Sequence, residues 1–330
     1  MMRLWQHARA LWPRYTLAPI LPFWLWTAFC AVRGEMRVDH IALALVTVVL
    51  AYTGPKTKRL YWGLLPMGLV ALLYDAMRFV KNLGLTSQTV HLCDLRAHEL
   101  RWFGFGEDGA RITAHDWLQA HSKTWLDLLC AIPYGTFIYV IVGYAVFLFF
   151  TDFAAQQRFT WGFFVLNLAG FITYHLYPAA PPWYFHQHGC VVDLGAAASA
   201  GPNLLRVDAL LGIHYFQAFY GRASDVFGAV PSLHVAYPFL MILEGFPRHG
   251  WLGRILLVGF YLLMGFAAVY LDHHWIIDAV VGSVYALVAY FLLRWLTPRV
   301  GRWAARMVGN PEVVRAAGPR APTSESVPCR

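Results

Sequence analysis

Charged residues are scarce in this chain. Of its 330 residues only 13% are Asp, Glu, Lys or Arg, whereas 58% are hydrophobic. So little charge cannot cover the surface of a soluble domain, and the composition excludes one. Basic residues outnumber acidic ones by 26 to 18, which gives a net charge of +8. We interpret this excess as a membrane-topology signal with some attraction to anionic lipids, and nothing indicates nucleic acid as a partner.

Cysteine is rare as well, with five residues in the chain. Cys30 and Cys130 lie in apolar runs, Cys329 lies in the C-terminal tail, and Cys93 and Cys190 fall in two long polar loops. In an oxidising compartment the last two either form a disulfide or remain free thiols, and the sequence leaves both interpretations open. No ligand spacing typical of zinc is present, so we expect neither a metal ion nor another cofactor.

Long apolar runs are what the chain has in abundance. The hydrocarbon core of a bilayer is about 30 Å thick, so a spanning helix needs roughly 20 apolar residues. Eight runs approach this length, although the second and the sixth are short. We therefore predict an all-α, polytopic membrane protein with about eight transmembrane helices. The runs lie near residues 17–33, 40–54, 61–80, 125–150, 160–178, 232–247, 251–271 and 275–297.

The apolar runs are predicted to belong to one domain. Residues 1–300 form a single integral membrane catalytic domain without internal repeats, and residues 301–330, rich in Arg, Pro and Ala, form a disordered cytoplasmic tail. Lys and Arg concentrate in alternate loops, which predicts that both termini face the cytoplasm. The long loops near 81–124 and 179–231 then lie on the extracytoplasmic face. Prolines near the first run, and the spans that follow it, favour an uncleaved anchor over a signal peptide.

Two short stretches about forty residues apart carry the chemistry. Val230–His234 (VPSLH) opens one apolar run, and Tyr270–Asp278 (YLDHHWIID) opens the last one. A single helix hairpin separates them, so both are expected at the same face of the membrane. His274 and Asp278 are four residues apart and are predicted to share a helix face. There the carboxylate can keep one imidazole nitrogen protonated and turn the other outward as a nucleophile or base.

His234 adds a second imidazole at the same depth, which can protonate a leaving alkoxide while the first attacks phosphorus. Ser232 is suited to cap the helix that follows Pro231, and its hydroxyl and the helix-start amides can hold phosphate oxygens. The plain alternatives are a structural hydrogen bond for the His274–Asp278 pair and a simple cap for Ser232. Ionisable groups are costly at the end of a membrane span, which favours the functional interpretation of the histidines.

These residues resemble the signatures of a known family. Pro-Ser-x-His followed by His-x-x-x-Asp is similar to the second and third signatures of the type 2 phosphatidic acid phosphatase superfamily. Within it, the chain resembles the inositol phosphorylceramide synthases, the targets of aureobasidin A, over roughly residues 60–297. The resemblance implies a core of six helices, an active site on the luminal or extracytoplasmic face, and a catalytic triad of His234, His274 and Asp278. It rests on Tyr177–Tyr184 (YPAAPPWY), Phe227–His234 (FGAVPSLH) and Tyr270–Asp278 (YLDHHWIID).

The chain departs from the phosphatases of that superfamily where they bind phosphate. Ala267 and Ala268 stand where the third signature has Ser-Arg, and the first signature is not evident. A phosphate monoester carries about two negative charges and a diester about one, so this loss favours transfer of a phosphodiester head group. For Asp75 we expect either a bond to a polyol hydroxyl, with Arg78 on the phosphate, or an internal ion pair with Arg78. For His273 we expect that it orients a neighbouring residue or a head group. Candidates for the missing cation are Arg78, Lys81 and Arg222.

We therefore expect a membrane phosphotransferase whose partners are lipids. The resemblance implies phosphatidylinositol as donor and ceramide as acceptor, with inositol phosphorylceramide and diacylglycerol as products. Both a phosphohistidine intermediate and direct displacement are compatible with the triad, and the sequence does not indicate whether a second subunit or a homo-oligomer takes part. The alternatives are a lipid phosphate phosphatase acting on phosphatidate or polyprenyl phosphates, and a transporter or lipid-binding scaffold without catalysis.

Overall fold

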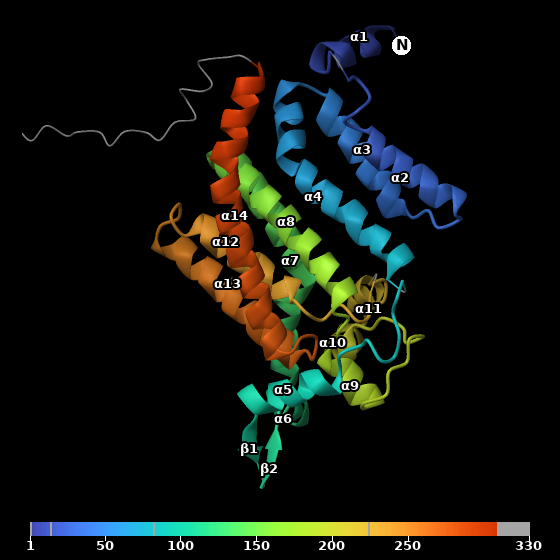
Figure 1. Ribbon diagram of the computed structural model, residues 1–330, viewed down its shortest axis with the longest axis vertical. Coiled ribbons are helices and arrows are strands. Elements are labelled where there is room, and N and C mark those ends of the chain that lie inside the picture. Colours follow the sequence, from blue (N-terminus) through green and yellow to red (C-terminus); the bar gives the residue numbers. More distant parts are fainter. Residues whose placement is uncertain (1, 14, 82, 108, 224, 309–330) are drawn as a thin grey trace, which may run out of the picture.

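A computed structural model describes residues 2–13, 15–81, 83–107, 109–223 and 225–308 of the chain (Figure 1). Helices dominate this part of the protein. Its only strands are β1 (Phe105–Glu107) and β2 (Ala110–Ile112), which pair as a short antiparallel hairpin. The predicted all-α class is confirmed.

All eight predicted apolar runs are helices. α14 continues past residue 300 into the segment predicted as tail, and residues 309–330 lie outside the described residues. Three of the helices are short: α2 (Leu21–Val32), α3 (Val38–Tyr52) and α12 (Leu233–Gly245). Five are long and apolar enough to cross a bilayer: α4 (Pro55–Val80), α7 (Thr124–Thr151), α8 (Phe153–Leu176), α13 (Trp251–Tyr270) and α14 (Ile276–Val308), the last over Ile276–Leu296.

The short helix α12 occupies the centre of the bundle, because it packs against α7, α8, α13 and α14. Its Leu240 and Met241 belong to one buried core together with Phe159 of α8 and Met264 of α13. The α2–α3 hairpin packs on the far side of α4, away from α12 and α14 (Figure 1). The segment with the first motif is therefore held by helices on all sides, whereas α2 and α3 are peripheral.

Small residues allow the closest approach within this bundle. A Cβ atom added to Gly282 of α14 would lie 2.2 Å from the carbonyl oxygen of Ser232. Only glycine leaves room for α14 to pass the start of α12 at this distance, as small residues do at membrane helix contacts. Gly282 thus sets the spacing between the two motifs.

The loops form a layer at one end of the bundle, at the bottom of Figure 1. Thr113 caps one of its helices by accepting a hydrogen bond from the Asp116 N–H. At the opposite end α1 (Met2–Leu11) contacts α3. The helices of the layer are α5 (Cys93–Phe103), α6 (Ala114–Ala120), α9 (Pro182–His188), α10 (Gly201–Leu211) and α11 (Tyr215–Tyr220).

A disulfide and a few backbone bonds hold this layer together. Cys93 at the start of α5 is bonded to Cys190 beyond α9, with their Cα atoms 5.7 Å apart, so the disulfide alternative is confirmed. Cys30 and Cys130 are buried free thiols. Three extended segments meet beside the disulfide, since Ala179 forms parallel bridges with both His91 and Gly228. These bridges fix the extended segment that leads into the first motif.

Replacing Gly282 by Ala should destabilise the protein, because the added methyl group has to displace the Ser232 backbone. Overpacking of this kind costs about 1–3 kcal/mol, so we expect a lower thermal midpoint in detergent and a loss of activity. Gly259→Ala in α13 is the matched control, since an added Cβ there meets nothing within 4 Å. Equal midpoints for the two variants would contradict the close approach.

Candidate active site

The two motifs meet through three hydrogen bonds. The Ser232 N–H donates to the Asp278 carbonyl at 2.9 Å, and the His274 Nδ1 lies 3.0 Å from the carbonyl oxygen of Ala229. The His234 Nδ1 lies 3.0 Å from the His274 Nε2. The structure therefore brings together the two histidines that the sequence places forty residues apart.

The partners of the two rings determine where their protons lie. A carbonyl oxygen only accepts hydrogen bonds, so the His274 Nδ1 carries a hydrogen. In a neutral ring the His274 Nε2 then has a lone pair and accepts from the His234 Nδ1–H. The lone pair that a nucleophile needs is thus on the His274 Nε2, and in the resting site it is occupied by His234.

Asp278 acts on His274 from a greater distance than the sequence suggests. Its Oδ2 accepts from the Trp275 N–H at 2.9 Å but lies 3.6 Å from the His274 Nδ1, which is beyond hydrogen-bonding distance. The predicted shared helix face is wrong, because α14 begins at Ile276 and His274 lies in the turn before it. The Ala229 carbonyl takes the direct bond, and the Asp278 carboxyl group is fully buried beside it.

Burial keeps the two adjacent histidines of this turn uncharged. It lowers the pKa of His274 to about 4, against the smaller opposing effect of the bond to Ala229. It likewise lowers the pKa of His273 to about 4. His274 therefore keeps an unprotonated nitrogen at neutral pH, as an attacking base or nucleophile requires.

Aromatic rings surround His234. The Tyr134 ring stacks on the imidazole with centroids 4.8 Å apart, and the Phe137 ring meets it edge-on at the same distance. Tyr220 lies 6.0 Å away on a third side. The Tyr134 hydroxyl is buried without a hydrogen-bond partner among the described residues. The surroundings of the histidine pair are therefore largely apolar and low in water.

Two further predicted residues lie beside the pair. Ser232 is fully buried and caps α12, since its Oγ accepts from the Val235 N–H at 3.4 Å. This contact agrees with the plain alternative and leaves the hydroxyl close to the helix-start amides. The His273 Nε2 donates to the Ala200 carbonyl at 2.7 Å, which ties the turn to the start of α10. His273 thus orients its neighbour His274.

Asp75 and Arg78 lie in a different cluster, at the contact of α4 with α2 and α3. Asp75 pairs with Arg37 at 2.5 Å and with Arg78 at 3.3 Å, and it accepts from the Trp26 indole at 2.8 Å. Arg78 also pairs with Glu35 at 3.3 Å. These contacts match the internal ion pair, and among the described residues no hydrogen bond or ion pair joins Asp75 or Arg78 to the histidine pair.

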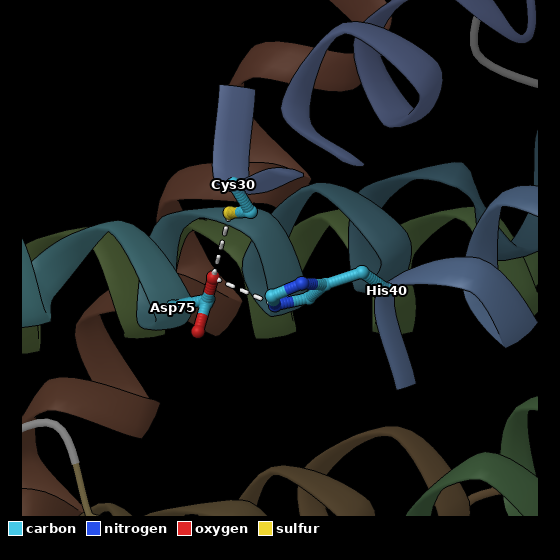
Figure 2. Close-up of side chains that lie close together, drawn as sticks. All are labelled: Cys30, His40 and Asp75. Carbon is cyan, nitrogen blue, oxygen red and sulfur yellow. Dashed lines mark hydrogen bonds and ion pairs between the residues drawn. The ribbon is translucent and has the colours of Figure 1, made fainter. Parts of the chain in front are cut away.

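The same cluster is the one place where the described residues bring three metal-ligating side chains together. Figure 2 shows the Cys30 thiol and the His40 ring pointing at the Asp75 carboxylate. His40 Nε2 lies 3.0 Å from Asp75 Oδ2. Both carboxylate oxygens, however, already face guanidinium groups, whose positive charges oppose a divalent cation. The arrangement is better suited to joining α2 and α3 to α4 than to holding a metal.

The cation that would bind phosphate is not at the position used by the phosphatases. Ala267 and Ala268 are both fully buried in the last turn of α13, where their carbonyls hold the turn that follows. Arg222 lies exposed in the loop before the first motif. Lys81 lines a cavity beside that loop. Of the candidate cations, Lys81 and Arg222 remain near the first motif.

Sequence reasoning missed a buried carboxylate that holds α14. Glu99 of α5 is fully buried, and its two oxygens accept from the Ile276 and Ile277 N–H groups at 3.0 and 3.3 Å. The first amides of a helix have no partner within it, and an acidic group there also favours the helix dipole. Glu99 thus caps α14 from another helix and fixes the position of Asp278.

A row of alternating charges continues from Glu99 across the outer layer. His115 lies 3.3 Å from Asp272, and Asp272 lies 2.5 Å from His186. His186 in turn meets Asp116 at 3.1 Å. Burial lowers the pKa of His186, but its bonds to Asp116 and Asp272 raise it more, to about 9. The turn that carries His273 and His274 is thus attached to α6 and α9 by contacts between acidic residues and histidines.

A signal for this row is present in the sequence. Asp272 lies inside the second motif beside His273, and it has a positive φ of 66°. His115 and Asp116 are adjacent polar residues at the start of α6. Nothing in their spacing, however, shows that His115 meets Asp272 or that Asp116 meets His186, 70 positions away.

The low pKa of His274 predicts an unusual pH dependence. In the unfolded chain a histidine titrates near 6.5, so stability contributed by the neutral rings is present above that pH and is lost as the pH falls toward about 4. We expect kcat/KM to fall on the acid side only well below pH 6.5. Circular dichroism spectra recorded at the same pH values show whether the fold is intact. An acid limb centred at 6.5 on an intact fold would contradict the burial of this ring.

Removing the Glu99 carboxylate should disturb α14 at its first turn. Glu99→Ala leaves two buried amides without partners, and each unsatisfied group costs about 1–3 kcal/mol. We expect a lower thermal midpoint and a lower kcat. His98→Ala, on the exposed side of α5, is the control. A Glu99→Ala variant as stable and active as the control would show that the cap is dispensable.

Comparisons with known proteins identify the family of the chain. The model of the PAP2 superfamily matches residues 106–292. The phosphoinositol dihydroceramide synthase of Bacteroides thetaiotaomicron is 30% identical over 279 residues, which cover 83% of this chain and 88% of that protein. No solved structure matches the chain.

Fungal enzymes are similar over a smaller part. The inositol phosphorylceramide synthase catalytic subunits of Schizosaccharomyces pombe and Saccharomyces cerevisiae are 29% and 30% identical over 195 and 180 residues. These matches cover 56% and 53% of this chain but only 45% and 44% of the fungal subunits. The region that matches the family model contains both motifs. It also contains Ala267 and Ala268, and the Ile276 and Ile277 amides that Glu99 caps. The chain belongs to the PAP2 superfamily and, within it, to the inositol phosphorylceramide synthase family of membrane phosphotransferases.

Proposed function

We propose that this protein transfers phosphoinositol from phosphatidylinositol to the hydroxyl group of ceramide or dihydroceramide, releasing diacylglycerol. At the coarser level it is a sphingolipid head-group transferase of the membrane. The observation that carries the finer proposal is the His234–His274 pair, 3.0 Å apart and enclosed by aromatic rings. The names of the relatives supply the phosphoinositol group and the ceramide or dihydroceramide that receives it.

The resting hydrogen bond indicates how a donor would enter. A phosphodiester between the two rings replaces the His234–His274 bond, so that the His274 Nε2 faces phosphorus and the His234 Nδ1–H faces the glycerol oxygen. The negative charge of the diester favours a protonated His234. The P–N bond to His274 forms as the P–O bond to glycerol breaks, and the proton of His234 Nδ1 passes to the departing oxygen.

The second half of the reaction reverses these roles. The ceramide hydroxyl gives its proton to the His234 Nδ1 and its oxygen attacks phosphorus, while the P–N bond breaks and frees the His274 Nε2. The Asp278 charge, 3.6 Å from His274, stabilises the positive ring in between. Direct attack by the ceramide oxygen, with His274 as the base, uses the same contacts.

The surroundings of the pair favour transfer over hydrolysis. Tyr134, Phe137 and Tyr220 shield His234 from bulk water, and a phosphohistidine in a dry site survives until a lipid hydroxyl arrives. A phosphatase needs an attacking water and a cationic clamp for a monoester. Buried Ala268 replaces the clamping residue of that superfamily. Both features support the transferase over the phosphatase.

We place the reaction on the extracytoplasmic face, with both termini in the cytoplasm. The pair lies beside the loop layer, because His273 bonds Ala200 before α10 and Glu99 of α5 bonds Ile276 and Ile277. The Cys93–Cys190 disulfide belongs to that layer, and structural disulfides persist in oxidising compartments outside the cytoplasm. The bias of Lys and Arg toward the other end supports the same orientation.

Transfer is tested with purified protein in mixed micelles of phosphatidylinositol and a fluorescent ceramide. We expect a labelled product heavier by one phosphoinositol, detected by chromatography and mass spectrometry. His274→Ala should lower its formation about 10³-fold or more, since loss of an acid–base group costs 10²–10⁴-fold. His121→Ala, an exposed histidine of the outer layer, is the control.

The outcomes separate the candidate functions. Inorganic phosphate released from phosphatidate, without any labelled lipid product, would replace the transferase by a phosphatase. Full turnover by a folded His274→Ala variant would overturn the assignment of the histidine pair. Lipid exchange that does not depend on either histidine would indicate a transporter.

A further inference from the structure

A small polar cavity opens beside the segment that holds His274. It lies where the ends of α4 and α8 meet the loop before the first motif, and its volume is about 100 Å³. Apolar residues of the 83–85 loop complete its wall. Its polar lining is formed by Lys81, Thr89, Tyr174, His175 and Asp225.

The cavity contains opposite charges that do not pair. Within the described residues no salt bridge of 4 Å or less involves Lys81 or Asp225. Asp225 is held in place because its Oδ1 accepts from the Phe227 N–H at 2.9 Å. Burial raises its pKa, which Lys81 and His175 partly offset. A cavity that offers both a cation and a carboxylate suits a ligand with an anionic group and several hydroxyl groups.

One extended segment connects this cavity with the histidine pair. Residues 225–232 begin at the cavity with Asp225 and end at the cap of α12 with Ser232. The segment is tied to Ala179 by two hydrogen bonds, because the Ala179 N–H donates to the Phe227 carbonyl at 2.7 Å and the Ala229 N–H donates to the Ala179 carbonyl at 3.1 Å. The carbonyl of Ala229 then accepts from the His274 Nδ1.

Tyr174 forms the second connection. It lines the cavity, and its hydroxyl donates to the Pro231 carbonyl at 2.9 Å, one residue before Ser232. Asp225 and Ala229 are four residues apart, so even a fully extended segment places them at most about 14 Å from each other. The cavity is thus connected by hydrogen bonds and a short segment to the carbonyl that binds His274.

We propose that Lys81 and Asp225 form the subsite for the polyol head group of the donor lipid, with phosphorus at His274. This inference rests on the proposed function. Asp225 accepts hydrogen bonds from adjacent ring hydroxyls, and Lys81 donates to an oxygen of the head group. The volume corresponds to about three water molecules at 30 Å³ each, so one edge of the polyol enters and the rest stays at the cavity mouth.

The subsite accounts for discrimination between donors. A choline or ethanolamine head group has no hydroxyls for Asp225, and its cation would meet Lys81. Such a donor leaves the partly buried Asp225 carboxylate without hydrogen-bond partners. A site built to bind hydroxyl groups strongly disfavours a ligand that lacks them. A polyol head group satisfies both charges. The cavity therefore determines specificity without touching the reacting atoms.

The test measures transfer from phosphatidylinositol to fluorescent ceramide by wild type, Asp225→Asn, Lys81→Gln and Gln88→Ala. The last is the control, exposed in the same loop and outside the cavity lining. We expect KM for phosphatidylinositol to rise about tenfold in the two cavity variants, which corresponds to about 1.4 kcal/mol. The kcat value and the thermal midpoint should stay within twofold and within a degree or so of the control. Unchanged KM values in both variants would overturn the subsite while leaving the transferase in place.

A binding measurement keeps the subsite testable if wild type makes no product. In that case the proposed function fails, and equilibrium binding of soluble glycerophosphoinositol to detergent-solubilised protein decides the question. Binding by wild type and Gln88→Ala that is lost in Asp225→Asn and Lys81→Gln supports the subsite. Absence of binding to wild type, or equal binding by all four proteins, overturns it.

Discussion

The carbonyl oxygen of Ala229 is the atom on which the site depends. By accepting from the His274 Nδ1 it determines the tautomer of that ring and directs the other nitrogen toward His234. It can do so only because the Ala179 backbone holds the extended segment 225–232 and because Gly282 lets α14 pass close to the Ser232 carbonyl. Backbone groups are less mobile than side chains, so this contact aligns the imidazole at little entropic cost. Asp278 lies 3.6 Å from a ring that is already positioned.

Burial of ionisable groups is the second constraint. Glu99, His115, Asp272 and Asp278 are all removed from solvent at one end of a membrane bundle, where an unpaired charge is expensive. The protein meets this requirement by alternating acids and bases from α5, α6 and α9 around the turn that carries His274. The loop layer is therefore part of the site, since it supplies the counter-charges that the membrane helices lack.

The peripheral α2–α3 hairpin has a separate role. Asp75 and Arg78, which the sequence offered as head-group ligands, instead join α4 to this hairpin through Glu35, Arg37 and His40. The polar residues near the first motif line a different site, the cavity of Lys81 and Asp225. Two clusters with similar residue types thus differ in role. The cluster of Asp75 and Arg78 joins helices, whereas Lys81 and Asp225 line a cavity that a ligand can enter.

Composition and hydrophobic runs alone determined the membrane class and the positions of all eight apolar helices, because a bilayer demands long apolar segments that are local in sequence. The motifs likewise predicted that His234 and His274 share one face, since a single hairpin separates them. Only the tertiary structure decided that Ala229 and not Asp278 bonds His274, that Glu99 caps α14, and that Asp75 belongs to an ion-pair cluster. These contacts join residues brought together by packing, and no periodicity within one segment records which distant segment lies against it.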